Sequence, residues 1–380
     1  MDFNFSEEQI MIRQAAKDFA ERDLIEDVIE RDTHSIYPTE HIKNLAELGF
    51  MGMMVDENYD GGGMDTVSYV LAVEEISKID ASVSVIMSVQ NSLVCYGLNK
   101  YGTQEQKEKY LRPLARGEHI GAFLLSEPEA GSDATSQSTS AIEKDDHYLL
   151  NGTKNWITSA NSASTYLVIA QSDADKGHHG INVFIVEKDS EGISLGPHED
   201  KMGMRSSDTH SVMFNDVKVP KENRIGEDGF GFKFAMKALE AGRIGIAAQA
   251  TGIAAGALDR ALKYSKERKT FGKLIGQHQA IAFKLSDMAV KVEAARNFVL
   301  KAAWLKDNDK EFGVAGAMAK QYAADIAMEV TTEAVQIFGG YGYVKEYHVE
   351  RLMREAKLTQ IYEGTSEIQK MVISRGLLRD

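Results

Sequence analysis

The distribution of proline is the feature that most limits how this chain folds. All five prolines lie in the first 220 residues, and residues 221–380 contain none. Because proline breaks the interior of a helix, such a segment is typical of long uninterrupted helices. Apolar and small residues recur there at steps of three and four, at Phe230, Phe234, Ala238, Ala241, Gly245, Ala248 and Gly252, and at Ile281, Leu285, Met288, Val292, Ala295 and Val299. We expect residues 229–380 to form a four-helix bundle packed through these stripes.

The middle of the chain has a different residue pattern, typical of β-strands. Short runs rich in Ile, Val, Phe, Tyr and Thr are separated by Gly, Asp and Asn, as in "IGAFLL", "YLVIAQ", "INVFIVE" and "HSVMFNDVKV". No long helical segment intervenes, so an antiparallel, barrel-like sheet is expected, with a tight hairpin at Asn151–Gly152. Residues 1–119 again read as helical, beginning with a capping box of Ser6 and Gln9. The chain is therefore predicted to be mainly α with a central β domain, an α–β–α arrangement of domains 1–119, 120–228 and 229–380.

Composition excludes several classes of protein. Lys plus Arg number 43 and Asp plus Glu 57, so the net charge of −14 argues against nucleic acid or an anionic membrane as a partner. No apolar run approaches the roughly 20 residues that span a bilayer, and no secretory signal is evident, so we expect a soluble, cytoplasmic protein. Cys95 is the single cysteine, no HExxH occurs, and the adjacent His178 and His179 read as solvated loop residues, so no metal site is predicted.

Two stretches in the predicted β domain combine glycine, hydroxyl and aromatic residues. In "AFLLSEPEAGSDATS" (122–136) a strand ends and a turn follows, whose N–H groups and hydroxyls suit a phosphate or polar heterocycle. Alternatively, the hydroxyls satisfy only the local backbone. In "NWITSAN" (155–161), Trp156 and Thr158 are two apart and face the same side of a strand. They could present a flat ring and a donor to a flat ligand, although a lone tryptophan is more often core.

A third stretch near the C-terminus, "QIYEGTSEIQ" (360–369), carries an isolated carboxylate. Ser366 and Gln369 form a capping-box pattern, which predicts that a helix starts there and leaves Glu363 in the loop before it. On its own, Glu363 reads as a solvated carboxylate favouring a helix N-terminus. Upstream, "QIFGGYGY" (336–343) supplies glycines that permit close approach of the backbone.

Taken together, these motifs are very specific. With "ERKTFGKLIGQHQ" between them, "LLSEPEAGSDA", "QIFGGYGY" and "IYEGTSEIQ" make the chain resemble the acyl-CoA dehydrogenase family over essentially its whole length, most of all its short-chain (butyryl-CoA) type. The resemblance implies an FAD-dependent enzyme that oxidises a short-chain acyl-CoA thioester to the trans-2-enoyl-CoA. It also implies electron-transfer flavoprotein as the electron acceptor and a homotetramer built as a dimer of dimers.

The resemblance assigns roles to individual residues. Glu363 would be the catalytic base, removing the α-proton while the β-hydrogen leaves as hydride to flavin N5, with its backbone N–H at the thioester oxygen. Burial would raise its pKa towards the working pH. Contacts to FAD would come from Phe123, Leu125, Ser126, Gly131, Ser132, Trp156, Ile157, Thr158, Thr365 and Glu367, and, on the FAD of a neighbouring subunit, from Arg268, Gln279, Gln336, Gly339 and Gly340. The substrate would meet Ser132, Glu240, Arg243 and Gly364.

Two positions on the predicted helix after residue 229 bear on the base. Relatives that place their base on that helix have it at the position of Gly242, and glycine here agrees with a base at Glu363. Glu240 departs from the aspartate usual in close relatives and reads as a substrate contact or a structural carboxylate, or, less favoured, as a second base. The alternatives left open are a branched short-chain dehydrogenase, an acyl-CoA oxidase, although those are longer, and a catalytically silent helical scaffold. Nitroalkane oxidases use aspartate as base and are disfavoured by Glu363.

Overall fold

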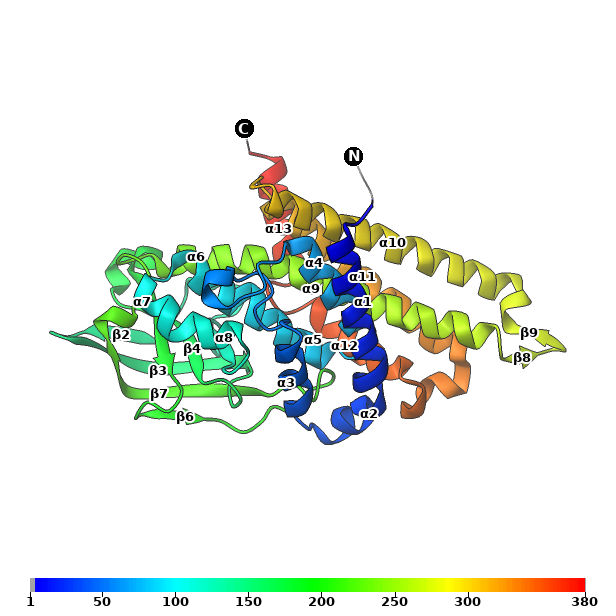
Figure 1. The fold of residues 1–380 in the computed structure, drawn as a ribbon, viewed down its shortest axis with the longest axis horizontal. Coiled ribbons are helices and arrows are strands. Elements are labelled where there is room, and N and C mark those ends of the chain that lie inside the picture. Colours follow the sequence, from blue (N-terminus) through cyan, green and yellow to red (C-terminus); the bar gives the residue numbers. More distant parts are fainter. Residues whose placement is uncertain (1–3, 380) are drawn as a thin grey trace.

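The computed structural model describes residues 4–379 and has the predicted helix–sheet–helix order (Figure 1). The N-terminal helices begin at a capping box in which the Ser6 hydroxyl accepts from Gln9 N and the Gln9 side chain accepts from Ser6 N, as predicted. Three π-helical segments, Ala20–Leu24, Val89–Cys95 and Lys107–Leu111, continue one helix into the next. The α-helices are α1 (Glu7–Phe19), α2 (Ile25–His34), α3 (Thr39–Glu47), α4 (Thr66–Ser77), α5 (Ala81–Ser88), α6 (Tyr96–Tyr101), α7 (Gln104–Gln106) and α8 (Arg112–Ala115).

The middle of the chain forms a seven-stranded sheet with the order β1-β4-β2-β3-β7-β6, and β5 pairs with β4. The strands are β1 (Gly121–Leu124), β2 (Ser140–Glu143), β3 (His147–Thr158), β4 (Thr165–Gln171), β5 (Ile181–Glu187), β6 (Ile193–Leu195) and β7 (Thr209–Pro220). Most pairings are antiparallel as predicted, but β4 pairs in parallel with β1 and, at one residue pair, with β2. The long connection from β1 to β4 permits this, because parallel neighbours need a crossover rather than a tight turn.

The predicted hairpin at Asn151–Gly152 is wrong. Both residues lie inside β3, and the chain turns earlier, between β2 and β3. Gly152 has φ +143° and sits at an irregularity in the register of β3 with β7, and a Cβ there would lie 2.6 Å from the Cα of Thr139. The glycine therefore serves a bulge and a close backbone approach, a use that the same dipeptide does not distinguish from a turn.

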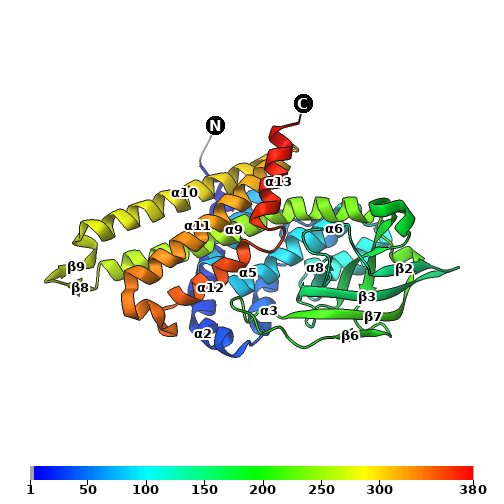
Figure 2. The same ribbon diagram turned by 180° about the vertical axis from the view of Figure 1, so that it is seen from behind.

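The C-terminal helices are α9 (Gly231–Ser265), α10 (Gln279–Asp307), α11 (Gly313–Phe338), α12 (Val349–Thr359) and α13 (Ser366–Leu377), with a small hairpin of β8 (Lys269–Thr270) and β9 (Lys273–Leu274) between α9 and α10. Apart from the partly buried Phe230 and Ile281, every member of the two predicted stripes is buried. From Ala241 to Leu258 α9 is buried on all sides, because N-terminal helices cover one flank and α10 to α12 the other. Figures 1 and 2 show the sheet at one end of the molecule and the β8–β9 hairpin at the other.

One helical stretch, Ala81–Tyr101, is long and apolar enough to cross a membrane by length and composition, contrary to the expectation from sequence. However, 94% of its most apolar window is buried within the protein. It is thus the core helix against which α4 and α9 pack, and its apolar character reflects burial on all sides rather than contact with lipid. Within residues 4–379 no group of three or more His, Cys, Asp or Glu side chains is placed to hold a metal ion.

Candidate active site

Glu363 lies in the turn between α12 and α13, and the start of α13 differs from the prediction by one residue. Thr365 is the N-cap, its hydroxyl accepting from Ile368 N at 3.3 Å. Ser366, the predicted cap, instead donates its hydroxyl to Asp325 of α11 at 3.1 Å. Gln369 turns back and donates to the carbonyls of Glu363 (3.2 Å) and Gly364 (2.8 Å). A tertiary partner for Ser366 therefore overrides the local capping pattern.

The backbone of this turn is left-handed at two successive residues. Glu363 has φ +52° and Gly364 has φ +91°. For a residue with a side chain, this conformation costs about 1–3 kcal/mol, and it persists only where its surroundings enforce it. Here Lys320 of α11 donates its ammonium to the carbonyl of Gly364 at 2.7 Å, alongside Gln369. No hydrogen bond from the backbone N–H of Glu363 exists within residues 4–379, which leaves this donor free for a ligand.

The Glu363 carboxylate is buried without a hydrogen-bond partner among the described residues. Both of its oxygens are inaccessible, and within residues 4–379 the carboxylate forms no ion pair. Burial raises its pKa to about 7, although the Lys320 ammonium and the Arg243 guanidinium act to lower it. Burial in turn lowers the pKa of Lys320 to about 8 and that of Arg243 below its ordinary value. A carboxylate that titrates near neutrality is suited to accept a proton in a catalytic step.

Gly242 of α9 provides the space that this carboxylate occupies. A Cβ at position 242 would lie 2.2 Å from Oε2 of Glu363 and 2.9 Å from Cδ2 of Leu93. Contacts this short do not occur between unstrained atoms, so any side chain at 242 would displace the carboxylate. The structure thus brings Gly242, Arg243, Glu363 and Gly364 together, four positions that the sequence marked for base and substrate.

Several residues that hold this turn were missed from the sequence. The Tyr362 hydroxyl donates to Oε1 of Gln249, and Nε2 of Gln249 donates to Ala81 O (2.9 Å) and Ser84 Oγ (2.8 Å), which anchors the turn to α5. Lys320 is fully buried on α11. A polar or charged residue inside an apolar stripe is the signal that could have identified Gln249 and Lys320, because such groups are buried only with partners.

The two stretches of the β domain meet through a buried ion pair. Lys154 of β3 donates to Glu127 (2.7 Å), to the Leu125 carbonyl (3.0 Å) and to Gln137 (3.1 Å). Next to it, Asn155 N donates to Ser126 O at 2.8 Å. Burial alone would raise the pKa of Glu127, but Lys154 lowers it to about 2, while burial lowers the pKa of Lys154 to about 8. The loop after β1 is therefore fixed against β3 beside Trp156.

Trp156 is presented to the outside of the sheet. It has φ +62°, lies at a register irregularity between Lys154 and Ile157, and is 60% exposed, so it is not a core residue. Ile157 is buried in the sheet core, whereas Thr158 is half-buried, an alternation consistent with a shared face for Trp156 and Thr158. The other predicted positions in the β domain also fall into a buried and an exposed group. Phe123 and Leu125 pack towards the core, and Gly131 and Ser132 are exposed. Around a Cβ built at Gly131 nothing lies within 4 Å, so the loop leaves open space there.

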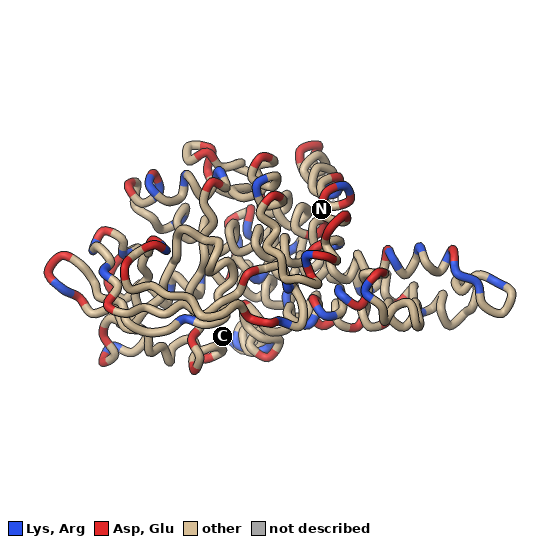
Figure 3. The backbone as a smooth tube through the Cα atoms, turned by 90° about the horizontal axis from the view of Figure 1, so that it is seen from below, with Lys and Arg blue, Asp and Glu red and all other residues tan. Residues whose placement is uncertain are grey.

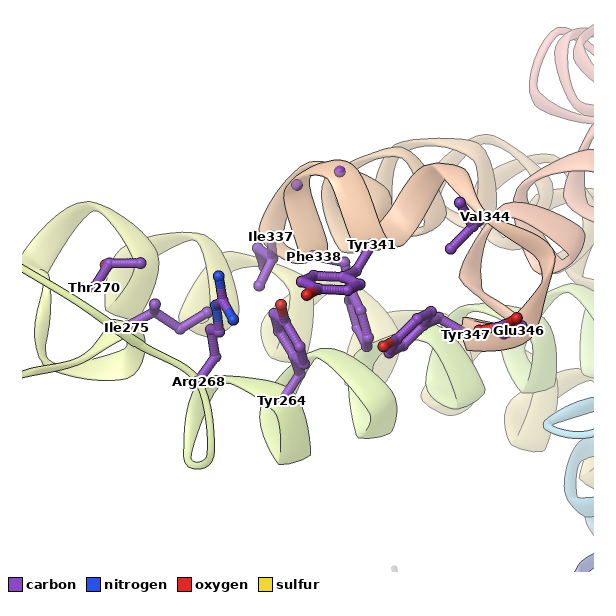
Figure 4. Close-up of a pocket in the computed structure, with 12 residues that line it drawn as sticks. Tyr264, Arg268, Thr270, Ile275, Ile337, Phe338, Tyr341, Val344, Glu346 and Tyr347 are labelled. Atoms are coloured by element: carbon purple, nitrogen blue, oxygen red, sulfur yellow. The ribbon is translucent and has the colours of Figure 1, made fainter.

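Three further predicted residues line a pocket at the opposite end of the molecule (Figure 4). Arg268, Gly339 and Gly340 surround a volume of about 520 Å³ together with aromatic side chains. Tyr264 stacks on Phe338 with ring centroids 4.2 Å apart, and the Arg268 guanidinium lies 5.3 Å from the centre of the Tyr341 ring. Gln279 and Gln336 are exposed and do not line this pocket. Within one chain, the sheet that includes β3 and the β8–β9 hairpin beside this pocket lie at opposite ends of the fold.

The remaining predicted residues are not gathered around Glu363. Glu240 accepts from Lys237 at 2.8 Å, one turn earlier on the same helix, and is not part of the buried group. Ser132 and Glu367 are exposed, and no contact joins them to Glu363. The Thr365 hydroxyl is occupied as the cap of α13. Their proposed contacts with substrate or cofactor therefore stay predictions.

The fold and the site define a class: an α–β–α protein with a carboxylate buried against α9 in the turn between α12 and α13. Comparison with family models then identifies it. Residues 6–118 match the acyl-CoA dehydrogenase N-terminal domain, residues 122–217 its middle domain and residues 229–378 its C-terminal domain. The chain belongs to the acyl-CoA dehydrogenase family.

Individual relatives are similar over their whole length. A protein of Clostridium acetobutylicum, named acyl-CoA dehydrogenase, short-chain specific, is 49% identical over 379 residues, with 100% of both chains covered. The solved butyryl-CoA dehydrogenase of Megasphaera elsdenii is 51% identical with a TM-score of 0.98, again over 100% of both chains. A chain in a structure described as the electron transferring flavoprotein of Acidaminococcus fermentans is 52% identical, with a TM-score of 0.99 and the same full coverage.

Proposed function

We propose that this chain is an FAD-dependent dehydrogenase that converts a short-chain acyl-CoA thioester into the trans-2-enoyl-CoA, with Glu363 as the base. One observation carries the proposal: the Glu363 carboxylate is buried, unpartnered and shifted in pKa to about 7 in a space kept open by Gly242. A buried carboxylate without a hydrogen bond is costly for stability. A scaffold protein has no use for such a group, whereas a general base does.

The residues present fit an FAD cofactor. A flat isoalloxazine ring needs an exposed aromatic or polar platform, and Trp156, 60% exposed beside Thr158, supplies one. Open space at Gly131 and the fixed loop after β1 allow backbone approach at the same edge. For the adenosine and diphosphate part, Arg268, Gly339 and Gly340 line an aromatic pocket at the far end of the chain. Since the β8–β9 hairpin beside this pocket lies at the opposite end of the chain from the sheet, the far pocket serves the cofactor of a neighbouring subunit, in keeping with a dimer of dimers.

When bound, the flavin accepts the β-hydrogen of the substrate as a hydride. The protein performs the rest of the reaction. Glu363 takes the α-proton, and its unpaired backbone N–H donates to the thioester oxygen, where charge develops as that proton leaves. Lys320 and Gln369 hold the left-handed turn so that both groups act from one residue. Burial keeps water away from the carboxylate and keeps its pKa near the working pH.

The other candidates are less well supported. Glu240 as a second base is disfavoured because Lys237 pairs with it. Similarity to a short-chain enzyme and to butyryl-CoA dehydrogenase favours straight short chains over branched ones. We further propose electron-transfer flavoprotein as the electron acceptor, supported by the similarity to a chain described with that flavoprotein, and a cytoplasmic location, supported by the bacterial relatives. We retain the domain boundaries 1–119, 120–228 and 229–380 as proposals.

Flavin spectroscopy tests the function. The purified protein should be yellow, and its flavin absorbance should bleach anaerobically when butyryl-CoA is added, faster than with thioesters of longer or branched chains. A colourless protein that fails to take up FAD would contradict the proposal. Rapid reoxidation of the reduced enzyme by air in the presence of product would favour an oxidase instead.

A further inference from the structure

The turn that carries Glu363 is a loop whose two ends meet. It runs from Gln360, which follows α12, to Ser366, the first residue of α13, and Glu363 lies midway between them. The backbone N–H of Ser366 donates to the carbonyl of Gln360 at 3.0 Å. The residues in between lie outside both helices. The placement of Glu363 therefore depends on how firmly these two ends are held together.

One carboxylate on α11 contacts both ends of the turn. Oδ1 of Asp325 accepts from Nε2 of Gln360 at 2.8 Å and from the hydroxyl of Ser366 at 3.1 Å. Its other oxygen, Oδ2, accepts from Nε2 of Gln321, about one turn earlier on the same helix, at 2.6 Å. A carboxylate suits this arrangement because each of its oxygens can accept two hydrogen bonds. A single oxygen thus joins the start of the turn to its end.

The same helix holds the middle of the turn with a group of the opposite charge. The Lys320 ammonium donates to the carbonyl of Gly364 at 2.7 Å. Burial lowers the pKa of Lys320 to about 8, and the carboxylates of Glu363 and Asp325 act against that shift. α11 therefore supplies an anion to the donors at the ends of the turn and a cation to an acceptor in its middle.

The conformation of Glu363 requires support of this kind. Its left-handed backbone, with φ +52°, persists only where the surroundings enforce it. The Glu363 carboxylate has no hydrogen-bond partner among the described residues that would hold it beside Gly242. Its position is thus set through the backbone of the turn and not through hydrogen bonds of its own oxygens.

We propose that Asp325 is a positioning residue of the reaction: by joining Gln360 to Ser366, it fixes the turn from which Glu363 accepts the α-proton. The inference rests on the proposed function. Asp325 acts through the turn and not on the substrate. Its loss therefore affects the chemical step, which needs accurate placement of the base, more than it affects binding of the thioester.

Steady-state kinetics of FAD-loaded variants with butyryl-CoA test this role. Asp325→Ala should lower kcat by at least about tenfold while KM changes little, because misplacement of a reacting group by about 1 Å costs about 100-fold. Asp325→Asn keeps an oxygen that can accept from both Gln360 and Ser366, so it should recover most of the natural kcat. Equal losses in the two variants, or a fully active Asp325→Ala enzyme, would overturn the proposal.

Two further variants separate this role from a general loss of stability. Gln321→Ala removes only the donor to Oδ2 and is the matched control, which should keep the natural kcat. Ser366→Ala removes one donor to Oδ1 and leaves the cap of α13, Thr365, in place, so kcat should fall less than in Asp325→Ala. Adding Ser366→Ala to Asp325→Ala should cause no further loss, because both act through one contact. Additive losses in the double variant would contradict this.

Hydrogen–deuterium exchange of residues 360–366 reports on the turn without any turnover. In Asp325→Ala these amides should exchange faster than in the natural protein, most of all that of Ser366, which donates to Gln360. Unchanged exchange would overturn the proposal. If butyryl-CoA fails to bleach the flavin of the natural protein while exchange still responds to Asp325→Ala, then the proposed dehydrogenase activity fails and Asp325 stands as the residue that holds the turn.

Discussion

The Glu363 carboxylate and the Cα of Gly242 face each other so closely that a Cβ on residue 242 would lie 2.2 Å from Oε2. Two residues that are 121 positions apart in sequence thus share one space, in which only one side chain fits. This relationship explains why a glycine stands on the central helix α9, where a helix former would otherwise be favoured by about 1 kcal/mol. Stability is given up there so that a carboxylate from another element can occupy the site.

Gly242→Ala should therefore reduce kcat/KM by about 100-fold or more while the protein still binds FAD, because misplacement of the base by about 1 Å has effects of that size. Stopped-flow measurement of flavin reduction gives the rate. Gly316→Ala is the matched control, since a Cβ there would meet Ile244 at an ordinary 3.6 Å. An active Gly242→Ala enzyme would show that Glu363 has room to move, against the packing described.

Replacing Lys320 by methionine should change the pH dependence of the reaction. The ammonium acts to lower the pKa of Glu363, so its removal raises that pKa above about 7, and less of the base is ionised at neutral pH. We expect the rising limb of the kcat profile to move up by about one pH unit. Lys320→Arg keeps the charge and should keep the limb closer to its original position. If the kcat profile of Lys320→Met is unchanged, the Lys320 ammonium does not set the pKa of Glu363.

Glu363 should also make the protein less stable as pH rises. Its folded pKa of about 7 lies above the ordinary 4.5, so between these values the folded state holds a proton that the unfolded chain has released. The free energy of unfolding therefore falls as pH rises through this window. Glu363→Gln should be more stable than the natural protein above pH 7, by up to about 3 kcal/mol, and no more stable near pH 4. Thermal unfolding across this range measures the difference, and a gap that is constant with pH would contradict the assignment.

The buried pair of Lys154 and Glu127 should be needed to hold the loop beside Trp156. Lys154→Met leaves a buried carboxylate unpaired and should cost about 3–5 kcal/mol of stability together with FAD affinity, and adding Glu127→Gln should restore part of both. Lys221→Met, which breaks an exposed pair with Glu143, should cost at most about 1 kcal/mol. FAD titration and denaturant unfolding of the four proteins report the two effects. Equal losses at Lys154 and Lys221 would show that burial of the pair is unimportant.

The sequence predicted best where a single local pattern decides the structure. Heptad-like stripes located the burial on α9 and α10, and the Ser6 capping box formed as expected. Prediction from the sequence failed where contacts with residues elsewhere in the chain decide the local structure. Asp325 draws the Ser366 hydroxyl away from capping, and Gly152 serves a close approach to Thr139 instead of a turn.

The same division holds at the site. A sequence motif singled out Glu363. The turn that carries it is held by hydrogen bonds from Lys320, Gln249 and Gln369, which lie on other helices or later in the chain. In the sequence, these residues appear only as polar positions within an apolar helical face. The pattern does not show which partner each of them contacts. Trp156 is a third kind of difference. Tryptophan is usually buried, but a bulge at which Trp156 has φ +62° turns this side chain away from the core.

The central claim is that Glu363 is the base, and flavin reduction in Glu363→Gln tests it most directly. The amide keeps the size of the side chain but cannot accept the α-proton. We predict a yellow protein that binds butyryl-CoA and whose anaerobic flavin reduction is slowed by at least about 100-fold, the lower end of the contribution of general base catalysis. Flavin that bleaches at the natural rate in this variant would contradict the claim and would place the base elsewhere, with Glu240 as the first residue to examine.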